Sequence, residues 1–157
     1  MKTLNDRLTT NASEEPMVVF LIGMRVNRWW KFGQWLRTGL AMPRMLRELG
    51  EHPELGFLGG ESWFGRTTIL VSYWKSVDHL FAYAKQRNAE HLPAWRSFNK
   101  LIGNNGDVGI WHETYIVQPG AHESIYVNMP EFGLGKVLGL RSASHRPDLV
   151  KRAAAAA

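Results

Sequence analysis

Residues 66–88 read "RTTILVSYWKSVDHLFAYAKQRN", and this stretch decides the fold class. Its first part, 66–74, is rich in β-branched and aromatic residues, which predicts a strand. Ser76 is then the expected N-cap of a helix over 76–88, because an acidic residue follows it in the first turn. A strand that leads directly into a helix indicates a mixed α and β domain.

The segments before this stretch extend the same alternation. Residues 17–25, "MVVFLIGMR", are apolar and β-branched and predict a buried strand. Residues 27–50 show helical spacing, and Pro43 should kink this helix or restart it as a first-turn proline. Residues 54–65 form a glycine-rich strand, which Gly65 should turn into the strand that follows.

The segments after it complete the pattern. Pro93 should separate a further helical piece, 92–103, from the preceding helix. Residues 106–120 predict a long strand, and 123–129 predict a shorter one. The order is therefore β-α-β-β-α-β with one extra strand. This is the α+β, ferredoxin-like split βαβ plan, an antiparallel sheet with both helices on one face.

The second face of this sheet should also be buried. The strand segments "VVFLIGM" and "TTILV" carry apolar residues at both alternating positions, although helices can cover only one side. A second copy of the sheet is the simplest cover. The sequence therefore predicts a homodimer with its sheets face to face, which forms a dimeric α+β barrel.

The length of 157 residues indicates one domain, expected over 17–129. Residues 1–16 are polar and predict a flexible arm. Residues 130–157 predict a glycine-containing lid, with Phe132 over the pocket mouth, and a disordered tail. There are no cysteines and no apolar leader, which favours a cytoplasmic location.

Charge and hydropathy restrict the partners. The net charge is +5, but the basic residues are scattered, so we expect no nucleic-acid partner. Stable membrane insertion is not expected, because no apolar run approaches about 20 residues. Residues 28–37, "RWWKFGQWLR", suggest contact with a membrane surface. Their tryptophans occupy several helix faces, however, and packing between helix and sheet is the favoured interpretation.

Several motifs resemble a known family. The stretch "VSYWKSVDHLFAYAKQRNAEH" (71–91) is similar to the dimeric α+β barrel superfamily, and in particular to antibiotic-biosynthesis-monooxygenase-like proteins. Within that group, "HLPAWRSFN", "WHETY" and "YVNMPEFGLG" resemble the family of the fumagillin-pathway monooxygenase. The resemblance covers about residues 17–140. It implies a barrel fold that hosts cofactor-free monooxygenases, haem enzymes and binding proteins, so the fold alone does not choose among them.

His91 is the first candidate site residue, because Pro93 should place it just before a helix N-terminus, where the helix dipole favours a neutral imidazole. A neutral imidazole can act as a base or as a metal ligand. The haem-degrading relatives carry their iron ligand in this region, although the spacing here differs by about two residues. A structural histidine at a helix junction is the alternative.

The remaining candidates should line an aromatic pocket. Glu113 and Tyr115 point to the same side of a strand and could form an acid–base pair, or they could lie on a solvated strand edge. Arg25 could pair with Glu113 or hold an anionic substrate group. The candidates for substrate binding are Arg25, Asn27, Trp95, Phe98, Trp111, Asn128 and Phe132. For Trp95 and Phe98, plain core packing is the favoured alternative.

The favoured function is a small dimeric monooxygenase that acts on an apolar or aromatic molecule without a cofactor. His91 or Glu113 would be the base, and Tyr115 and Asn128 would be hydrogen-bond donors. One alternative is a haem protein that binds haem b with His91 as the axial ligand. Another is a protein that binds hydrophobic ligands without catalysis.

Overall fold

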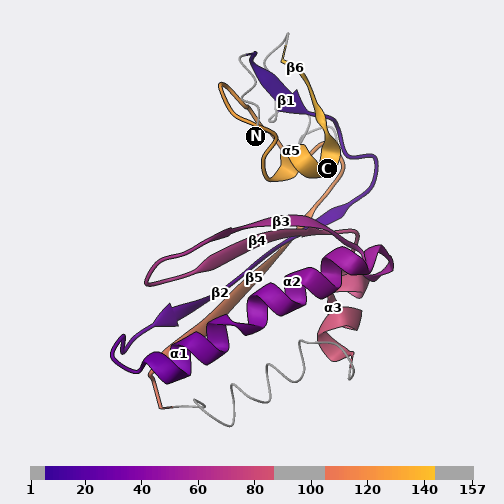
Figure 1. The fold of residues 1–157 in the computed structure, drawn as a ribbon. Coiled ribbons are helices and arrows are strands. Elements are labelled where there is room, and N and C mark those ends of the chain that lie inside the picture. Colours follow the sequence, from indigo (N-terminus) through magenta and orange to yellow (C-terminus); the bar gives the residue numbers. More distant parts are fainter. Residues whose placement is uncertain (1–5, 87–104, 144–157) are drawn as a thin grey trace.

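The computed structural model describes residues 6–86 and 105–143 of the chain (Figure 1). The elements are β1 (Leu8–Thr10), β2 (Met17–Val26), α1 (Phe32–Gly39), α2 (Ala41–Glu51), the 3-10 turn η1 (Pro53–Leu55), β3 (Phe57–Trp63), β4 (Ile69–Trp74), α3 (Val77–Lys85), β5 (Val108–Val117), α5 (Leu134–Leu138) and β6 (Leu140–Ser142).

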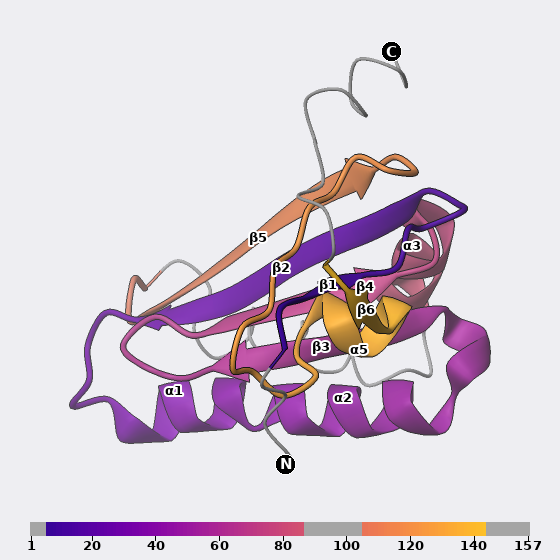
Figure 2. The same cartoon turned by 90° about the horizontal axis from the view of Figure 1, so that it is seen from above.

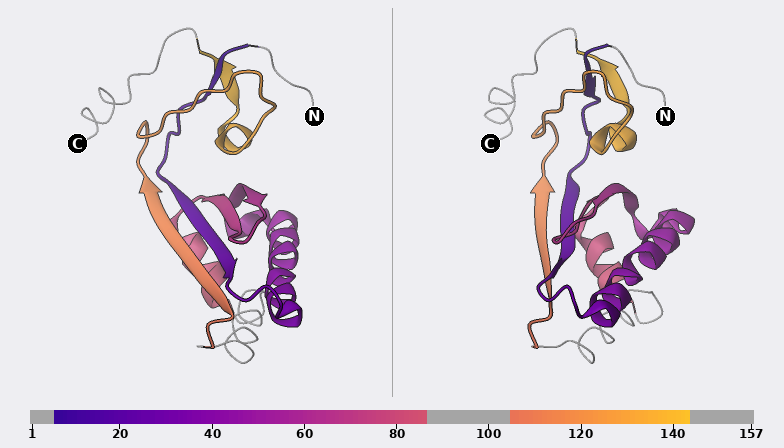
Figure 3. Two further views of the ribbon diagram at one scale, coloured as in Figure 1. Left: turned by 90° about the vertical axis from the view of Figure 1, so that its left-hand side faces the viewer. Right: turned by 60° about the vertical axis from the view of Figure 1, so that its left-hand side comes forward.

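Four of the strands form an antiparallel sheet in the order β3-β4-β2-β5. The strand that follows α2 therefore lies two places from β2, with β4 between them, as the split βαβ plan requires. β2 is paired with β5 along its full length, from Met17 opposite Val117 to Val26 opposite Val108. Helices α1, α2 and α3 cover one face of this sheet (Figures 1 and 3). The predicted α+β, ferredoxin-like fold is confirmed.

The core lies between these helices and the sheet. Val18 of β2 and Trp74 of β4 pack against Leu49, Leu80 and Tyr83 from the helices, and all five are buried. The buried Trp74 satisfies its indole N–H by donating to Ser72 Oγ at 3.1 Å, and Ser72 in turn donates to the carbonyl oxygen of Phe20. A buried tryptophan usually has such a partner for its N–H, because an unsatisfied buried donor costs stability.

The helices follow the sequence closely. The helical segment predicted over 27–50 restarts at Leu40, and Pro43 lies in the first turn of the new helix α2, which is one of the two predicted alternatives; its missing N–H costs nothing there. Ser76 caps α3 as predicted, and its Oγ accepts the N–H of His79. The Phe81 side chain of α3 is 50% exposed. Tyr83 takes the core position, because its hydroxyl donates to Glu48 at 2.7 Å.

The remaining elements form a small second unit. β1 pairs with β6, so residues 8–10 form a strand within the segment that the sequence suggested was a flexible arm. The strand predicted over 123–129 is instead a loop with a single bridge, from Tyr126 to Leu8. This unit lies on the side of the four-stranded sheet opposite the helices (Figures 1 and 2), and α5 contacts β3.

No helix within the described ranges is both long and apolar enough to span a bilayer.

Candidate functional site

The sheet face that points away from the helices carries the candidate site. Strand residues alternate between faces, and directly paired residues share a face. Since Val18 and Phe20 belong to the helix side, their neighbours Val19 and Leu21 point to the opposite side. The register assigns to this opposite face Val19, Leu21, Gly23, Arg25, Glu61, Trp63, Val71, Tyr73, Trp111, Glu113 and Tyr115.

β5 contributes a row of three predicted site residues to this face: Trp111, Glu113 and Tyr115. The Tyr115 hydroxyl donates to Glu113 Oε2 at 2.6 Å. Both side chains are also exposed on the edge strand β5, as the solvated-edge alternative predicted, so an acid–base role stays a prediction. This hydrogen bond, together with the negative charge of the carboxylate, raises the pKa of Tyr115 above its ordinary value. Tyr115 is therefore the hydrogen-bond donor of the pair and Glu113 is the acceptor.

The same pair predicts a change in tyrosine titration. Glu113→Gln should lower the pKa of Tyr115 toward its ordinary value of about 10, because the carboxylate that opposes phenolate formation is removed. In the unaltered protein, the hydrogen bond stabilises the fold at pH values below about 10, the ordinary pKa of tyrosine. This stabilisation is lost as the pH rises through the raised pKa of Tyr115. NMR titration of labelled tyrosine measures this, and Tyr115→Phe assigns the signal. An unchanged titration in Glu113→Gln would show that the hydrogen bond is absent in solution.

The segment predicted to be a lid contacts the β3 side of this face through residues 132–137, and its action as a lid stays a prediction. The Phe132 ring packs edge-on against Trp63, with ring centroids 5.8 Å apart. Lys136 makes an ion pair with Glu61 at 2.5 Å, and the backbone N–H of Gly133 points to the same carboxylate. A side chain at Gly59 would meet Val137 at 3.3 Å. Phe132 thus lies over the same face as the β5 row, but at the opposite edge of the sheet.

The β2 and β5 side of the face is more open. One register row runs across all four strands from Glu61 through Val71 and Leu21 to Glu113. The two carboxylates therefore lie on opposite edge strands, about 14 Å apart, with aliphatic side chains between them. Glu61 is held by Lys136, whereas Glu113 is exposed and its described partner is Tyr115. The result is an apolar surface with the hydrogen-bonded Glu113 carboxylate at its open edge.

Trp111 lies against Gly23, its direct neighbour on β2. A Cβ built on Gly23 would be 2.8 Å from the Trp111 Nε1 and 1.9 Å from the Thr68 carbonyl oxygen, so only glycine fits. Nε1 is buried and has no hydrogen-bond partner among the described residues. An unsatisfied donor costs stability, and such groups cluster where a ligand or water completes them.

Arg25 and Asn27 have structural partners. Arg25 donates to Thr67 Oγ1 at 2.9 Å. It cannot pair with Glu113, because Glu113 is opposite Leu21, about 13 Å further along β2. That alternative was wrong, while a role in holding an anionic group stays a prediction. The Asn27 side-chain amide donates to the carbonyl oxygen of Gly106.

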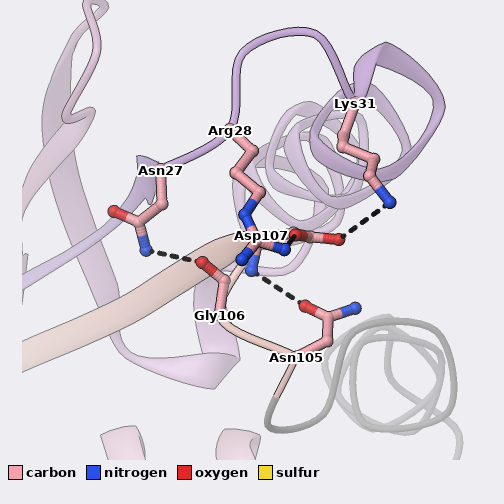
Figure 4. A network of polar contacts seen from close by, with 6 residues as sticks. All are labelled: Asn27, Arg28, Lys31, Asn105, Gly106 and Asp107. Atoms are coloured by element: carbon pink, nitrogen blue, oxygen red, sulfur yellow. Dashed lines mark hydrogen bonds and ion pairs between the residues drawn. The ribbon is translucent and has the colours of Figure 1, made fainter.

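Asn27 belongs to a polar network at the start of β5 (Figure 4). Asp107 is 2% exposed, and its carboxylate binds Arg28 at 2.7 Å and Lys31 at 3.7 Å. The Asp107 carbonyl oxygen also accepts the backbone N–H groups of Asn27 and Arg28. This network fixes the loop between β2 and α1 onto β5.

The other predicted residues do not join the β5 row. Asn128 lies exposed in the loop after β5 with a left-handed φ of 54°, which is typical of a turn residue. His91, Trp95, Phe98 and the helix predicted over 92–103 lie outside the described residues, so their roles stay predictions.

Sequence reasoning missed three residues of this face: Glu61, Trp63 and Tyr73. Burial raises the pKa of Tyr73 above its ordinary value, so it stays neutral beneath the lid segment, next to Gly133. The alternation of Ile69, Val71 and Tyr73 along β4 was the available signal. The orientation of Glu61 and Trp63 could not be read from strand alternation, because their strand is glycine-rich and has an irregular register between Phe57 and Gly59.

Among the residues that the structure describes, no three His, Asp or Glu side chains come together to hold a metal ion. Haem binding through His91 depends on the part of the chain outside those residues.

Comparisons with known proteins identify the family. The family model described as Monooxygenase af470-like matches residues 17–134. Monooxygenase af470 of Aspergillus fumigatus is 34% identical over 89 residues, which cover 53% of this chain but only 31% of that relative. The chain therefore matches less than a third of the relative's length.

Solved structures give more distant similarities. SnoaB, a cofactor-independent oxygenase from Streptomyces nogalater, has a TM-score of 0.45 and 14% identity, with 63% of this chain and 90% of SnoaB covered. A protein of unknown function from Bacteroides thetaiotaomicron, a possible oxidoreductase, has a TM-score of 0.47 and 14% identity, and the match covers 65% of this chain and 98% of that protein. The family match spans the whole four-stranded sheet and the β5 row, and the chain belongs to the Monooxygenase af470-like family.

Proposed function

We propose that the sheet face bearing the β5 row is the active site of a monooxygenase that oxidises an apolar or aromatic small molecule without a cofactor. The observation that carries the proposal is the pair of Glu113 and Tyr115 at the edge of an aliphatic surface. Membership of a monooxygenase family supports the reaction class. The aliphatic surface supports an apolar substrate, because it offers contact area and few polar partners.

The proposed reaction begins with a proton transfer. Glu113 removes a proton from an activated CH₂ group of the substrate, and Tyr115 keeps the carboxylate oriented through its hydrogen bond. The resulting carbanion is delocalised over the substrate, and it supplies electrons to dioxygen. A C–O bond forms, and protonation gives a hydroperoxide. Loss of water then breaks the O–O bond and leaves a carbonyl group, so that CH₂ and O₂ become C=O and H₂O.

In this reaction the substrate supplies all the electrons, so no external reductant is required. The protein must stabilise the anionic intermediate and exclude bulk water. Trp111 lies on the same face, and Val19, Leu21 and Val71 offer the apolar surface.

The open side of the face also supports the predicted homodimer. Val19 and Leu21 are only half-buried in the single chain, and a second sheet over them would remove them from water and dry the surroundings of Glu113. Light scattering at low micromolar concentration should give about twice the chain mass of 17.9 kDa. A stable monomer would overturn the dimer.

An oxygen-uptake assay tests the activity. The purified protein, with chelator present and without added flavin or hemin, should consume oxygen with an aromatic ketone whose CH₂ group is acidified by the ring system. Uptake that appears only after hemin is added would overturn the cofactor-free reaction and favour the haem alternative. The visible spectrum of the same sample, with and without hemin, distinguishes these cases.

A further inference from the structure

One end of the molecule exposes a group of large aromatic side chains. Trp29, Trp30 and Phe32 lie where the chain passes from β2 into α1, and their exposed fractions are 65%, 59% and 57%. Packing of these tryptophans between helix and sheet was expected from the sequence, and this expectation was wrong. Exposed aromatic residues in a contiguous group indicate an interaction surface.

The group is held in place. The Trp29 ring contacts the rings of Trp30 and Phe32 edge-on, with centroids 6.1 and 6.3 Å apart. The Trp35 indole donates to the carbonyl oxygen of Trp29 at 2.9 Å. The aromatic rings are therefore presented by a fixed loop, and the apolar stripe continues along α1 at Leu36 and Leu40, which are 50% and 54% exposed.

A second element adds to the same end. Phe64, at the turn between β3 and β4, is 85% exposed. The turn is tied to the end of β2, because the Val26 N–H donates to the Arg66 carbonyl oxygen at 2.8 Å and Arg25 binds Thr67. Figures 1 and 2 show this turn and α1 at the same end of the sheet. We name the surface of Trp29, Trp30, Phe32 and Phe64 the aromatic end.

Basic residues lie beside the aromatic end. Arg25, Arg28 and Lys31 are exposed at the end of β2 and in the loop that leads into α1. Arg66 is also exposed beside Phe64. Asp107 is buried and offsets part of the charge of Arg28 and Lys31. A positive excess therefore remains around the aromatic side chains.

We propose that the aromatic end docks the protein onto an anionic lipid bilayer as a peripheral contact. Tryptophan combines an apolar ring with an N–H donor, which suits the boundary between headgroups and acyl chains. Arginine and lysine at the rim bind lipid phosphates and keep their charges at the surface. The positive excess around the rings is complementary to the negative surface of such a bilayer. The proposal does not depend on the reaction proposed above.

Co-sedimentation of the full chain with vesicles tests the proposal. Vesicles of phosphatidylcholine with about 30 mol% phosphatidylserine should pellet the protein at low salt, and pure phosphatidylcholine should bind it at least about fivefold more weakly. Binding should also fall as salt is raised, because the charges are exposed.

Two variants on separate elements and one control locate the contact. The double change Trp29→Ser and Trp30→Ser, and separately Phe64→Ser, should each weaken binding by about tenfold or more. Phe81→Ser removes an aromatic side chain of comparable exposure on α3 and should leave binding unchanged. Circular dichroism checks that each variant folds.

Three results would overturn the proposal. The unaltered protein does not bind the anionic vesicles, Phe81→Ser weakens vesicle binding as much as the changes at the aromatic end do, or binding does not depend on lipid charge. If the unaltered protein does not bind vesicles and a variant at the aromatic end changes the mass measured by light scattering, the surface instead contacts a second copy of the chain.

Discussion

Glu113→Gln is expected to lower oxygen uptake by about 10²–10⁴-fold, which is the usual contribution of a positioned general base. The amide keeps the size of the side chain and can still accept a hydrogen bond from the Tyr115 hydroxyl, but it cannot take a proton from the substrate. The surface around Leu21 and Val71 is unchanged, so the substrate should still bind. Oxygen-electrode rates over a range of substrate concentrations measure the effect.

The controls separate a catalytic effect from a structural one. Glu123→Gln removes an exposed carboxylate in the loop after β5 and should leave the rate unchanged. Tyr115→Phe should reduce the rate less than Glu113→Gln does, because the base stays and only its orientation is lost. A Glu113→Gln protein with unaltered kcat would refute the assignment of the base.

Gly23→Ala should lower the free energy of unfolding by about 3 kcal/mol or more, the upper range for overpacking a core. The new Cβ would lie 1.9 Å from the Thr68 carbonyl oxygen, which belongs to the backbone and cannot rotate away, and 2.8 Å from the Trp111 Nε1. β2 and β4 would have to separate, and Trp111 would lose its position on the face. Urea denaturation measures the change.

Gly109→Ala is the matched control for this prediction. Gly109 is also a strand glycine on this side of the sheet, and a Cβ there would meet its nearest neighbours at 3.8 and 3.9 Å, which is ordinary contact. Alanine should be neutral or slightly stabilising at this position, because it restricts the unfolded chain. Equal destabilisation by the two variants would show that the close approach at Gly23 is not the cause.

The sequence was informative where local patterns control the structure. The strand and helix of 66–88 were predictable because propensity, the Ser76 cap and apolar spacing agree. The orientation of Glu113 and Tyr115 followed from strand alternation alone. Their direct hydrogen bond was only one of two possibilities, since residues two apart on a strand can also remain separately solvated.

Long-range contacts were less predictable. β1 and β6 are three residues each and lie about 130 positions apart, and such short strands carry almost no periodic signal. The β2–β5 register separates Arg25 from Glu113, and the pairing of Arg25 with Thr67 places its actual partner on the other side of β2; sequence alone specified neither. The exposure of Trp29 and Trp30 was also missed, because tryptophan is usually buried and the prediction followed that general tendency.

Isotope labelling tests the central claim, a substrate-driven monooxygenase reaction at the β5 row, most directly. The chelator-treated protein is supplied with labelled dioxygen and the aromatic ketone, and the product is analysed by mass spectrometry. We predict that one labelled oxygen atom enters the product carbonyl and the other enters water, and that Glu113→Gln abolishes this incorporation. A product that carries no label, or full incorporation by Glu113→Gln, would contradict the account.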